Sequence, residues 1–576
     1  FDGKGVEFNV RLSESVLARL HYIIYTDPAH PPEYDLAEVE AHLAEAARLW
    51  TDNLYEALLE SLGEERGTEL YHRYKEAFPA SYQEEFLARR AVPDILRLEE
   101  LESEQDLRMS LYHPLEAPED ALRFKLYRRG RPITLSEALP LLENMGVKVM
   151  NEHGPYEITP SGGERFWIHD FGLKAEGGLH TEEVGEIFQE AFARLWRGEV
   201  EDDGFNRLVL GARLGWREVS LLRACCKYLR QTGLSFSQRY MEDTLYAHPD
   251  IARGLVELFT ARFDPGRPRR EESAEEIVSG IERALESVES LDEDRIIRSF
   301  LRLILAMTRT NYFQPGPPGE PGKPYISFKL DPQKVPGLPL PRPMFEIFVY
   351  SPRTEGVHLR GGRVARGGIR WSDRREDFRT EILGLMKAQM VKNAVIVPVG
   401  AKGGFVVKRP PEEGDRDALM REVARCYQTL IRGMLDLTDN LRDGEVVPPP
   451  RVVRHDGDDP YLVVAADKGT ATFSDLANAI SAEYGFWLGD AFASGGSTGY
   501  DHKKMGITAR GAWESAKRHF RALGKDIQSE DFTVVGIGDM SGDVFGNGML
   551  QSRHIKLVGA FDHRHVFLDP NPDPEK

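Results

Sequence analysis

RGGIRWSDRREDFRTEILGLMKAQMVKNAVIVPVGAKGGFVVK, residues 366–408, combines three local patterns in one stretch. A glycine pair opens it, and the amphipathic segment 376–394 predicts a long helix. An apolar run that predicts a strand follows, and then Lys402 stands between Gly400, Gly403 and Gly404. Glycines mark turns or close backbone approach. We therefore expect Lys402 in a glycine loop that a ligand can approach closely.

The same stretch places cations where they can meet. Gln389 and Lys392 are three residues apart, so they share one face of the predicted helix. Arg366, Lys392 and Lys402 can converge on one cleft, to which Gln389 adds an uncharged donor. Converging cations suit a small dianion, because each carboxylate can be neutralised by a charge-assisted hydrogen bond. Lone cations are often solvated surface groups, and that alternative stays open for each of them.

A second segment, YLVVAADKGTATFSDLANAI at 461–480, brings an aspartate to a strand end. Asp467 follows an apolar strand and precedes a Gly-Thr turn, and ligands gather at such edges of sheets. The alternative is that Asp467 caps the next helix. Ser474 and Asp475 fit that capping position better.

A third segment, residues 530–565, resembles a dinucleotide-binding fingerprint. The predicted strand FTVVGIG runs into Gly536, Gly538 and Gly542, and a helix is expected after them. A second strand, IKLVGAF, ends at Asp562, 24 residues beyond Gly538. An acidic residue about 20 residues after the glycines binds the ribose 2′-hydroxyl and rejects a 2′-phosphate, which favours NAD over NADP. His563 and His565 have no third ligand in view, so we expect no metal.

The rest of the chain predicts several domains. A chain of 576 residues is too long for one core. The formal net charge of −19 opposes nucleic acid or anionic membrane as a general partner. Three cysteines suit the reducing cytoplasm, and no apolar run reaches the ~18 residues of a membrane span. Cys225 and Cys226 lie in an amphipathic helical pattern and are expected to pack in a core.

Organisation along the chain follows from periodicity. A helical pattern fills 1–110, including a helix over 14–28, and the β-α-β-β order of 111–180 suggests a small ferredoxin-like module. A structural α+β module without a sensing role fits that order equally well. Residues 181–310 are again helical. Ten prolines between Pro315 and Pro343 predict a linker into a new domain.

These segments resemble the glutamate dehydrogenase superfamily, specifically its large bacterial NAD-dependent class. The resemblance is carried by residues 367–404, by ADKGTATFSDLAN and by GIGDMSGDVFGNGML, and it is close from about Tyr312 to Lys576. It implies an α/β multidomain protein with ACT-like α+β and helical modules. An α/β glutamate-binding catalytic domain at 311–495 and the start of a Rossmann-type NAD-binding domain at 496–576 would follow them.

The resemblance also implies residue roles. Lys402 falls on the catalytic lysine and Asp467 on the catalytic aspartate, while Lys392 and Gln389 fall on the groups that bind the substrate α-carboxylate. Arg366 replaces a lysine that reads the side-chain carboxylate, and arginine can bind a carboxylate bidentately. Thr508 resembles the threonine that holds the nicotinamide amide.

The implied reaction is NAD-dependent oxidative deamination of L-glutamate to 2-oxoglutarate and ammonia. We expect a cytoplasmic homo-oligomer with an amino-acid effector, and we expect this stretch alone to be inactive because the nucleotide domain has only its first two strands. Two alternatives remain. One is another amino-acid dehydrogenase of the same superfamily, which Arg366 disfavours because an apolar substrate has no use for that cation. The other is a non-catalytic amino-acid sensor built on the N-terminal modules.

Overall fold

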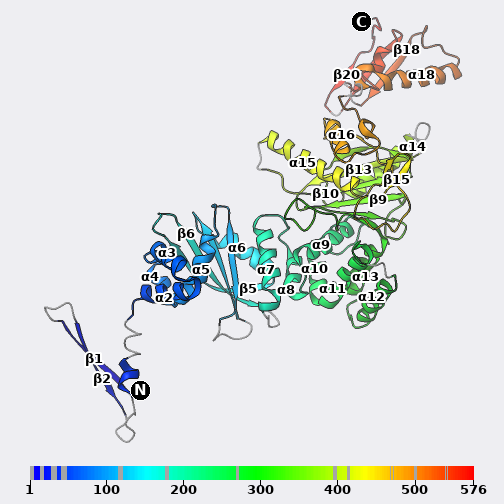
Figure 1. The fold of residues 1–576 in the computed structure, drawn as a ribbon. Helices are drawn as coiled ribbons and strands as arrows, with labels where there is room; N and C mark the ends of the chain where they lie inside the picture. The colour runs from blue at the N-terminus through cyan, green and yellow to red at the C-terminus, as the bar shows by residue number, and fades with distance from the viewer. Residues whose placement is uncertain are drawn as a thin grey trace. The chain divides into compact units, whose positions relative to one another are not determined.

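The computed structural model describes most of the chain (Figure 1). The described residues are 5–12, 18–26, 35–40, 48–114, 121–175, 181–267, 271–392, 399–411, 415–467, 469–470, 472–497, 502–538, 540, 542–562 and 564–575. They form two compact units, one of residues 1–140 with 147–181 and one of residues 141–146 with 182–576.

The first unit begins with a β-hairpin where a helix is expected. Strands β1 (Gly5–Leu12) and β2 (Ala18–Tyr25) pair antiparallel, with Phe8 opposite Tyr22. The helix predicted over 14–28 is therefore wrong, and the helical region 1–110 starts with strands. The β2 sequence ARLHYIIY is rich in aromatic and β-branched residues, which favour a strand when a partner strand is at hand.

Four helices and a four-stranded sheet form the core of the first unit. The helices are α2 (Trp50–Leu62), α3 (Glu64–Tyr74), α4 (Ala80–Glu85) and α5 (Ala88–Glu99). The strands are β3 (Leu107–Tyr112), β4 (Ala121–Arg129), β5 (Val147–Ile158) and β6 (Phe166–Ala175). Leu54, Leu70 and Ile95 of the helices share one apolar core with Ile158 and Ile168 of the sheet.

The β-α-β-β order expected in this region is confirmed. Strand β4 is followed by α6 (Leu135–Asn144), β5 and β6, and the sheet order is β3-β4-β6-β5. Helix α6 starts as the sequence indicates, since the Thr134 amide donates to the Glu137 carboxylate at 2.9 Å. The edge strand β3 comes from the N-terminal side of this motif and was not foreseen.

The second unit opens with a helical region. Its elements are α7 (Thr181–Trp196), η1 (Gly204–Arg207), α8 (Leu208–Gly211), α9 (Trp216–Gln231), α10 (Gln238–Ala247), α11 (Pro249–Phe263), α12 (Glu271–Leu285) and α13 (Leu291–Ala306). Cys225 and Cys226 lie fully buried in α9, and burial raises the pKa of both thiols. Their predicted role in core packing is confirmed.

A nine-stranded mixed sheet follows, in the order β17-β16-β12-β13-β10-β9-β8-β7, with β11 also paired to β13. The strands are β7 (Met307–Thr310), β8 (Ile326–Leu330), β9 (Phe345–Tyr350), β10 (Thr354–Arg360), β11 (Ala365–Arg366), β12 (Gly368–Trp371), β13 (Val399–Val407), β16 (Val464–Ala466) and β17 (Ala493–Ser494). Neighbours from β13 to β17 are parallel, and neighbours from β13 to β7 are antiparallel.

The proline-rich segment 315–343 is more than the predicted linker. Strand β8 lies within it, is buried at every position and pairs with both β7 and β9. The prolines stand on either side of β8 and none lies inside it, so they leave its ladder of hydrogen bonds complete. The many prolines around β8 led to the prediction of a linker, although the five residues of β8 themselves contain none.

A smaller group of helices and strands follows the nine-stranded sheet along the chain, and the nine-stranded sheet itself is covered by helices. They are α14 (Phe378–Lys392), α15 (Arg416–Leu435) and α16 (Ser474–Glu483), with a hairpin of β14 (Asn440–Arg442) and β15 (Glu445–Val447) between α15 and α16. The last elements are α17 (His502–Met505), α18 (Ile507–Ala522), β18 (Phe532–Ile537), η3 (Asn547–Leu550), β19 (Ile555–Phe561) and β20 (Val566–Leu568). Among the described helices, none combines the length and apolar character needed to cross a membrane.

His358 on β10 predicts acid sensitivity. It is 1% exposed, and neither ring nitrogen has a hydrogen-bond partner among the described residues. Burial, reinforced by Arg360, lowers its pKa to about 3. Between pH 6.5 and 3 the unfolded chain therefore binds the additional proton, and stability falls as the pH falls. We expect this to cost roughly 1.5 kcal/mol between pH 6.5 and 5.

The measurement is urea unfolding of wild type and His358→Leu across that pH range. His358→Leu should lose this share of the pH dependence, whereas His519→Leu, at an exposed position of α18, should keep it. Equal pH dependence in wild type and His358→Leu would show that the ring is protonated in the folded protein.

Candidate functional site

Lys402 lies inside a strand and not in the expected loop. Gly400, Lys402 and Gly404 point to the same face of β13, because side chains alternate along a strand. Helix α14 lies against that face: a Cβ on Gly400 would be 2.6 Å from the Met390 amide nitrogen, and one on Gly404 would overlap Ile382. The glycines thus serve close packing of a helix on a strand, and Lys402 is the side chain between them.

Lys402 meets Asp467 across an intervening strand. The Lys402 Nζ lies 2.5 Å from Asp467 Oδ2, and Lys402 is 8% exposed. Strand β12 runs between β13 and β16, and its register places Gly368 beside Lys402 on one side and Ala465 on the other. A Cβ on Gly368 would lie 3.1 Å from the Asp467 Cβ. The absence of a side chain at Gly368 leaves room for the two charged groups to meet.

A second cation reaches the same carboxylate oxygen. Arg370 Nε lies 3.1 Å from Asp467 Oδ2, and its Nη1 lies 3.0 Å from Glu381 Oε1 on α14. Ser372 donates to the other Glu381 oxygen at 2.6 Å. Partial burial alone would lower the pKa of Arg370, but its bonds to Asp467 and Glu381 raise it above the usual value. Asp467 therefore faces two cations in a partly buried site.

The turn after β16 is fixed to β12. The Asp467 amide donates to Thr470 Oγ1 at 3.1 Å, and Thr470 Oγ1 donates to the Ile369 carbonyl at 2.7 Å. Gly469 has a φ of +81°, a backbone conformation that glycine adopts without strain. Asp467 stands at the strand end, as predicted.

Arg370, Glu381 and Thr470 were missed from the sequence. The available signal for Arg370 was its spacing, two residues after Gly368 on the same face of a strand. Glu381 offered a signal too, because it lies in the first turn of the helix that packs over Lys402.

The structure places the other predicted substrate residues near the start of β13. Arg366 is exposed and stands opposite Gly400 in the β11–β13 pair. Gln389 on α14 backs onto Gly400, where an added Cβ would lie 2.7 Å from its carbonyl carbon. Lys392 ends α14, and its side chain is outside the described residues, as are 393–398. Arg366 and Gln389 thus lie beside the strand residue two positions before Lys402.

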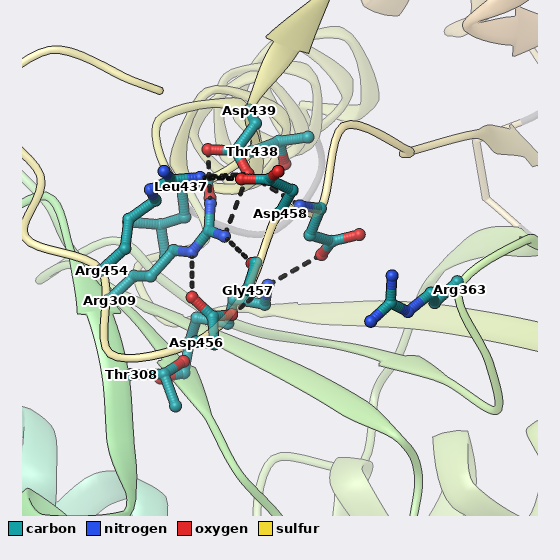
Figure 2. Close-up of polar contacts among 12 residues, drawn as sticks. Thr308, Arg309, Arg363, Leu437, Thr438, Asp439, Arg454, Asp456, Gly457 and Asp458 are labelled. Atoms are coloured by element: carbon teal, nitrogen blue, oxygen red, sulfur yellow. Dashed lines mark hydrogen bonds and ion pairs between the residues drawn. The ribbon is translucent and has the colours of Figure 1, made fainter. Parts of the chain in front are cut away.

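A buried ion cluster guides the chain into β16. Arg309 on β7 pairs with Asp439 at 2.9 Å and with Asp456 at 2.6 Å, and Figure 2 shows its guanidinium also facing the carbonyls of Leu437 and Gly457.

Asp459 extends this cluster toward the centre of the sheet. It pairs with Arg360 of β10 and, at 2.8 Å, with Lys329 of β8. Burial would raise the pKa of Asp459, but these two cations hold it below its usual value. The segment that leads to Asp467 is therefore tied to the antiparallel half of the sheet.

Strands β18 and β19 of the predicted nucleotide segment are parallel, as expected, but β20 adds a third strand, antiparallel to β19, where only two strands are expected. Gly538 follows β18 with a φ of +125° and nothing within 4 Å of an added Cβ. A Cβ on Gly536 would overlap the Phe545 ring, so this glycine serves packing. Asp539 and Ser541 are outside the described residues.

The helix expected after Gly542 is wrong for the described residues. Turns and the 3₁₀ helix η3 stand there instead. Three glycines at 542, 546 and 548 disfavour a regular α-helix at that place.

Asp562 and Thr508 both make hydrogen bonds within the nucleotide segment. Asp562 stands after β19, and its Oδ1 accepts from the amides of Arg564 and His565 at 2.7 Å each. These two bonds lower the pKa of Asp562. Thr508 lies in the first turn of α18, and its amide donates to Asp543 at 2.9 Å. His563 is outside the described residues.

Comparison with known proteins identifies the domains. The family described as bacterial NAD-glutamate dehydrogenase, catalytic domain, matches residues 280–576. The chain belongs to the bacterial NAD-glutamate dehydrogenase family. Further matches are the glutamate dehydrogenase helical motif 3 at 200–265, ACT3 domain at 106–185, helical motif 2 at 57–101 and ACT2 domain at 1–51.

Three relatives are named NAD-specific glutamate dehydrogenase. Those of Halomonas elongata and Pseudomonas aeruginosa are 56% and 54% identical over 98% of this chain, which covers 35% of each relative. That of Mycobacterium tuberculosis is 49% identical over 100% of this chain and 37% of its own length. The chain thus spans about a third of the length of these members of the glutamate dehydrogenase family.

Gly368→Ala tests whether the glycine on β12 is needed for the Lys402–Asp467 contact over that strand. The added methyl must displace the Ala466 carbonyl, 2.9 Å away, or move Asp467. We expect a loss of about 1–3 kcal/mol in the free energy of unfolding, measured in urea. A crystal structure of the variant should show a lengthened Lys402–Asp467 contact. Gly384→Ala on α14, where nothing lies within 4 Å, is the control and should be neutral or stabilising. Equal stability of wild type and Gly368→Ala would contradict this account.

Proposed function

We propose that this chain contributes the glutamate-binding and catalytic part of an NAD-dependent glutamate dehydrogenase. The observation that carries the proposal is the Lys402–Asp467 pair across β12, inside the domain that matches the family's catalytic domain. The proposed reaction converts L-glutamate, water and NAD into 2-oxoglutarate, ammonium, NADH and a proton. The names of the relatives support the substrate and the cofactor.

The two central residues divide the proton transfers between them. Asp467 accepts the proton from the substrate nitrogen and later returns one to the departing ammonia. Lys402, in its neutral amine form, takes the proton from the water that attacks the imine carbon, which is general base catalysis. Their 2.5 Å contact gives the proton a direct path from one group to the other. Arg370 holds the Asp467 carboxylate in place, so it is a positioning residue.

Substrate carboxylates are proposed to bind beside the start of β13. Arg366 reads the side-chain carboxylate, while Lys392 and Gln389 hold the α-carboxylate. Fixing both ends of the substrate brings its Cα into one orientation before reaction. Because an apolar amino acid has no side-chain carboxylate to pair with Arg366, this role disfavours the substrates of the leucine, valine and phenylalanine dehydrogenases of the superfamily.

NAD, when bound, would accept the hydride from the substrate Cα. The backbone at Gly538 fits a close ligand, because nothing lies within 4 Å of an added Cβ there, while Gly536 packs against Phe545 and Gly542 is the third glycine of the motif. Asp562 would bind the ribose hydroxyls at the end of β19, and Thr508 would contact the nicotinamide amide.

We further propose a Rossmann-type domain that starts at 496, an ACT-like module at 111–180 that takes an amino-acid effector, and a cytoplasmic homo-oligomer.

An amino-acid panel on the enzyme at its natural length tests the function. NAD reduction with glutamate, and not with leucine, valine or phenylalanine, is the expected result. Arg366→Leu should lower kcat/KM for glutamate by roughly 10–100-fold, because one charge-assisted pair is lost. Activity of the wild type with leucine or valine would assign another amino-acid dehydrogenase. Absence of NAD reduction with every amino acid, together with amino-acid binding by the ACT-like module, would assign a sensor.

Lys402→Ala separates catalysis from binding. We expect turnover to fall by about 10²–10⁴-fold, the usual size of a general base effect, while the Kd for glutamate changes little. Lys387→Ala, at an exposed position on α14, is the matched control and should keep wild-type turnover. A parallel loss of turnover and affinity in Lys402→Ala would make Lys402 a binding residue.

A further inference from the structure

The first unit contains a large cavity that the proposed reaction does not use. Its volume is about 660 Å³, and it lies between the α4–α5 segment and strands β3, β4 and β5. Sites for small molecules commonly span 300–1,000 Å³ and combine apolar walls with a few fixed polar groups. The cavity therefore has the size of a ligand site.

The floor of the cavity is a buried, fully bonded ion pair. Lys125 is 4% exposed, and its Nζ lies 2.6 Å from Asp94 Oδ2 and 4.2 Å from the centre of the Phe86 ring. Asp94 also accepts from the hydroxyls of Tyr82 at 2.5 Å and Tyr127 at 2.7 Å. Three donors hold the Asp94 carboxylate, so its charge is compensated within the floor.

The other carboxylates near the cavity are also committed to partners. Glu85 accepts from Tyr156 and, at 2.8 Å, lies beside His153, and the Tyr156 bond is the main cause of its lowered pKa. Asp170, which is fully buried, pairs with Arg123 at 2.9 Å and accepts from Tyr112 at 2.8 Å. The Arg123 side chain is thereby fixed in the cavity wall.

The rim adds three exposed arginines from α5. Arg97 bonds Glu100 at 3.1 Å, whereas Arg89 and Arg90 make no ion pair with any described residue. Arg89 and Arg90 lie in the first turn of α5, which has no acidic residue and no side-chain cap. Cations are unfavourable at a helix N-terminus, because the helix dipole is positive there. A bound anion would offset both unfavourable placements.

We propose that this cavity binds a small polyanion with at least two carboxylate or phosphate groups. Five cations line it, namely Arg89, Arg90, Arg97, Arg123 and Lys125, against the two carboxylates of Glu85 and Asp94. Lys125, Arg123 and Arg97 already have carboxylate partners, so the uncompensated positive charge is that of Arg89 and Arg90, in a chain whose formal net charge is −19. Arginine forks bind carboxylate and phosphate oxygens bidentately, and the cavity leaves room for two such groups at once.

Isothermal titration calorimetry of the full chain with citrate and with inorganic pyrophosphate tests the proposal. At least one probe should bind with a submillimolar Kd that weakens as salt is added, because exposed charges are screened. The tighter probe identifies the chemistry as carboxylate or phosphate. The variant Arg89→Ser/Arg90→Ser should bind at least tenfold more weakly, whereas Arg89→Lys/Arg90→Lys should lie between this variant and wild type, because the charge stays and the bidentate fork is lost.

Arg131→Ser/Arg165→Ser is the matched control, since it removes the same charge from exposed positions of the same unit outside the cavity. It should bind within twofold of wild type. The proposal is overturned if neither probe binds at millimolar concentration. It is equally overturned if the two serine variants lose affinity to the same extent, which would reflect net charge alone.

Discussion

Side chains from two strands meet closely over the strand between them where that strand has a glycine, because no side chain then stands between the two. In this sheet the place is Gly368, and it lets Lys402 of β13 contact Asp467 after β16. Gly400 and Gly404 impose a similar condition on the other side, because α14 lies against the strand at both positions. Three glycines therefore set the space in which one lysine and one aspartate interact. Any Cβ at these positions would separate elements that the site requires to be close.

Buried charges extend this constraint into the rest of the sheet. Arg309, Arg360 and Lys329 come from three different strands, and all are nearly fully buried. Their partners Asp439, Asp456 and Asp459 lie on the segment between α15 and β16. A buried charge without its partner is strongly destabilising, so this segment has one favourable route across the sheet. Asp467 follows Asp459 by eight residues, so its position depends on the route that the buried charges fix.

Much of the site could be predicted from the sequence, because its signals are local. The apolar period of α14, the short apolar strand before Asp467 and the glycines around Lys402 are all visible within a few residues. What the glycines do could not be predicted in the same way. The sequence predicts a loop there, since glycine without its neighbours indicates a turn, but pairing with β10 and β12 makes the segment a strand. Arg370 was missed because its partners, Asp467 and Glu381, lie 97 and 11 residues away.

The errors elsewhere have the same origin. Strand β2 matches a helical period in its sequence, and its pairing with β1 decides otherwise. Strand β8 is five residues long among prolines, and its neighbours β7 and β9 complete its hydrogen bonds. Both are cases in which tertiary context outweighs a weak local preference.

The two basic sites of the chain differ in a way that matches their proposed roles. Lys402 is nearly buried, and its ammonium contacts a carboxylate that Arg370 also binds, an arrangement suited to passing a proton between two groups. The cavity of the first unit offers mainly arginines, which remain charged at every physiological pH and therefore bind anions without exchanging protons. Its one buried lysine is already paired with Asp94. The difference between lysine and arginine thus separates the proposed catalytic site from the proposed anion site.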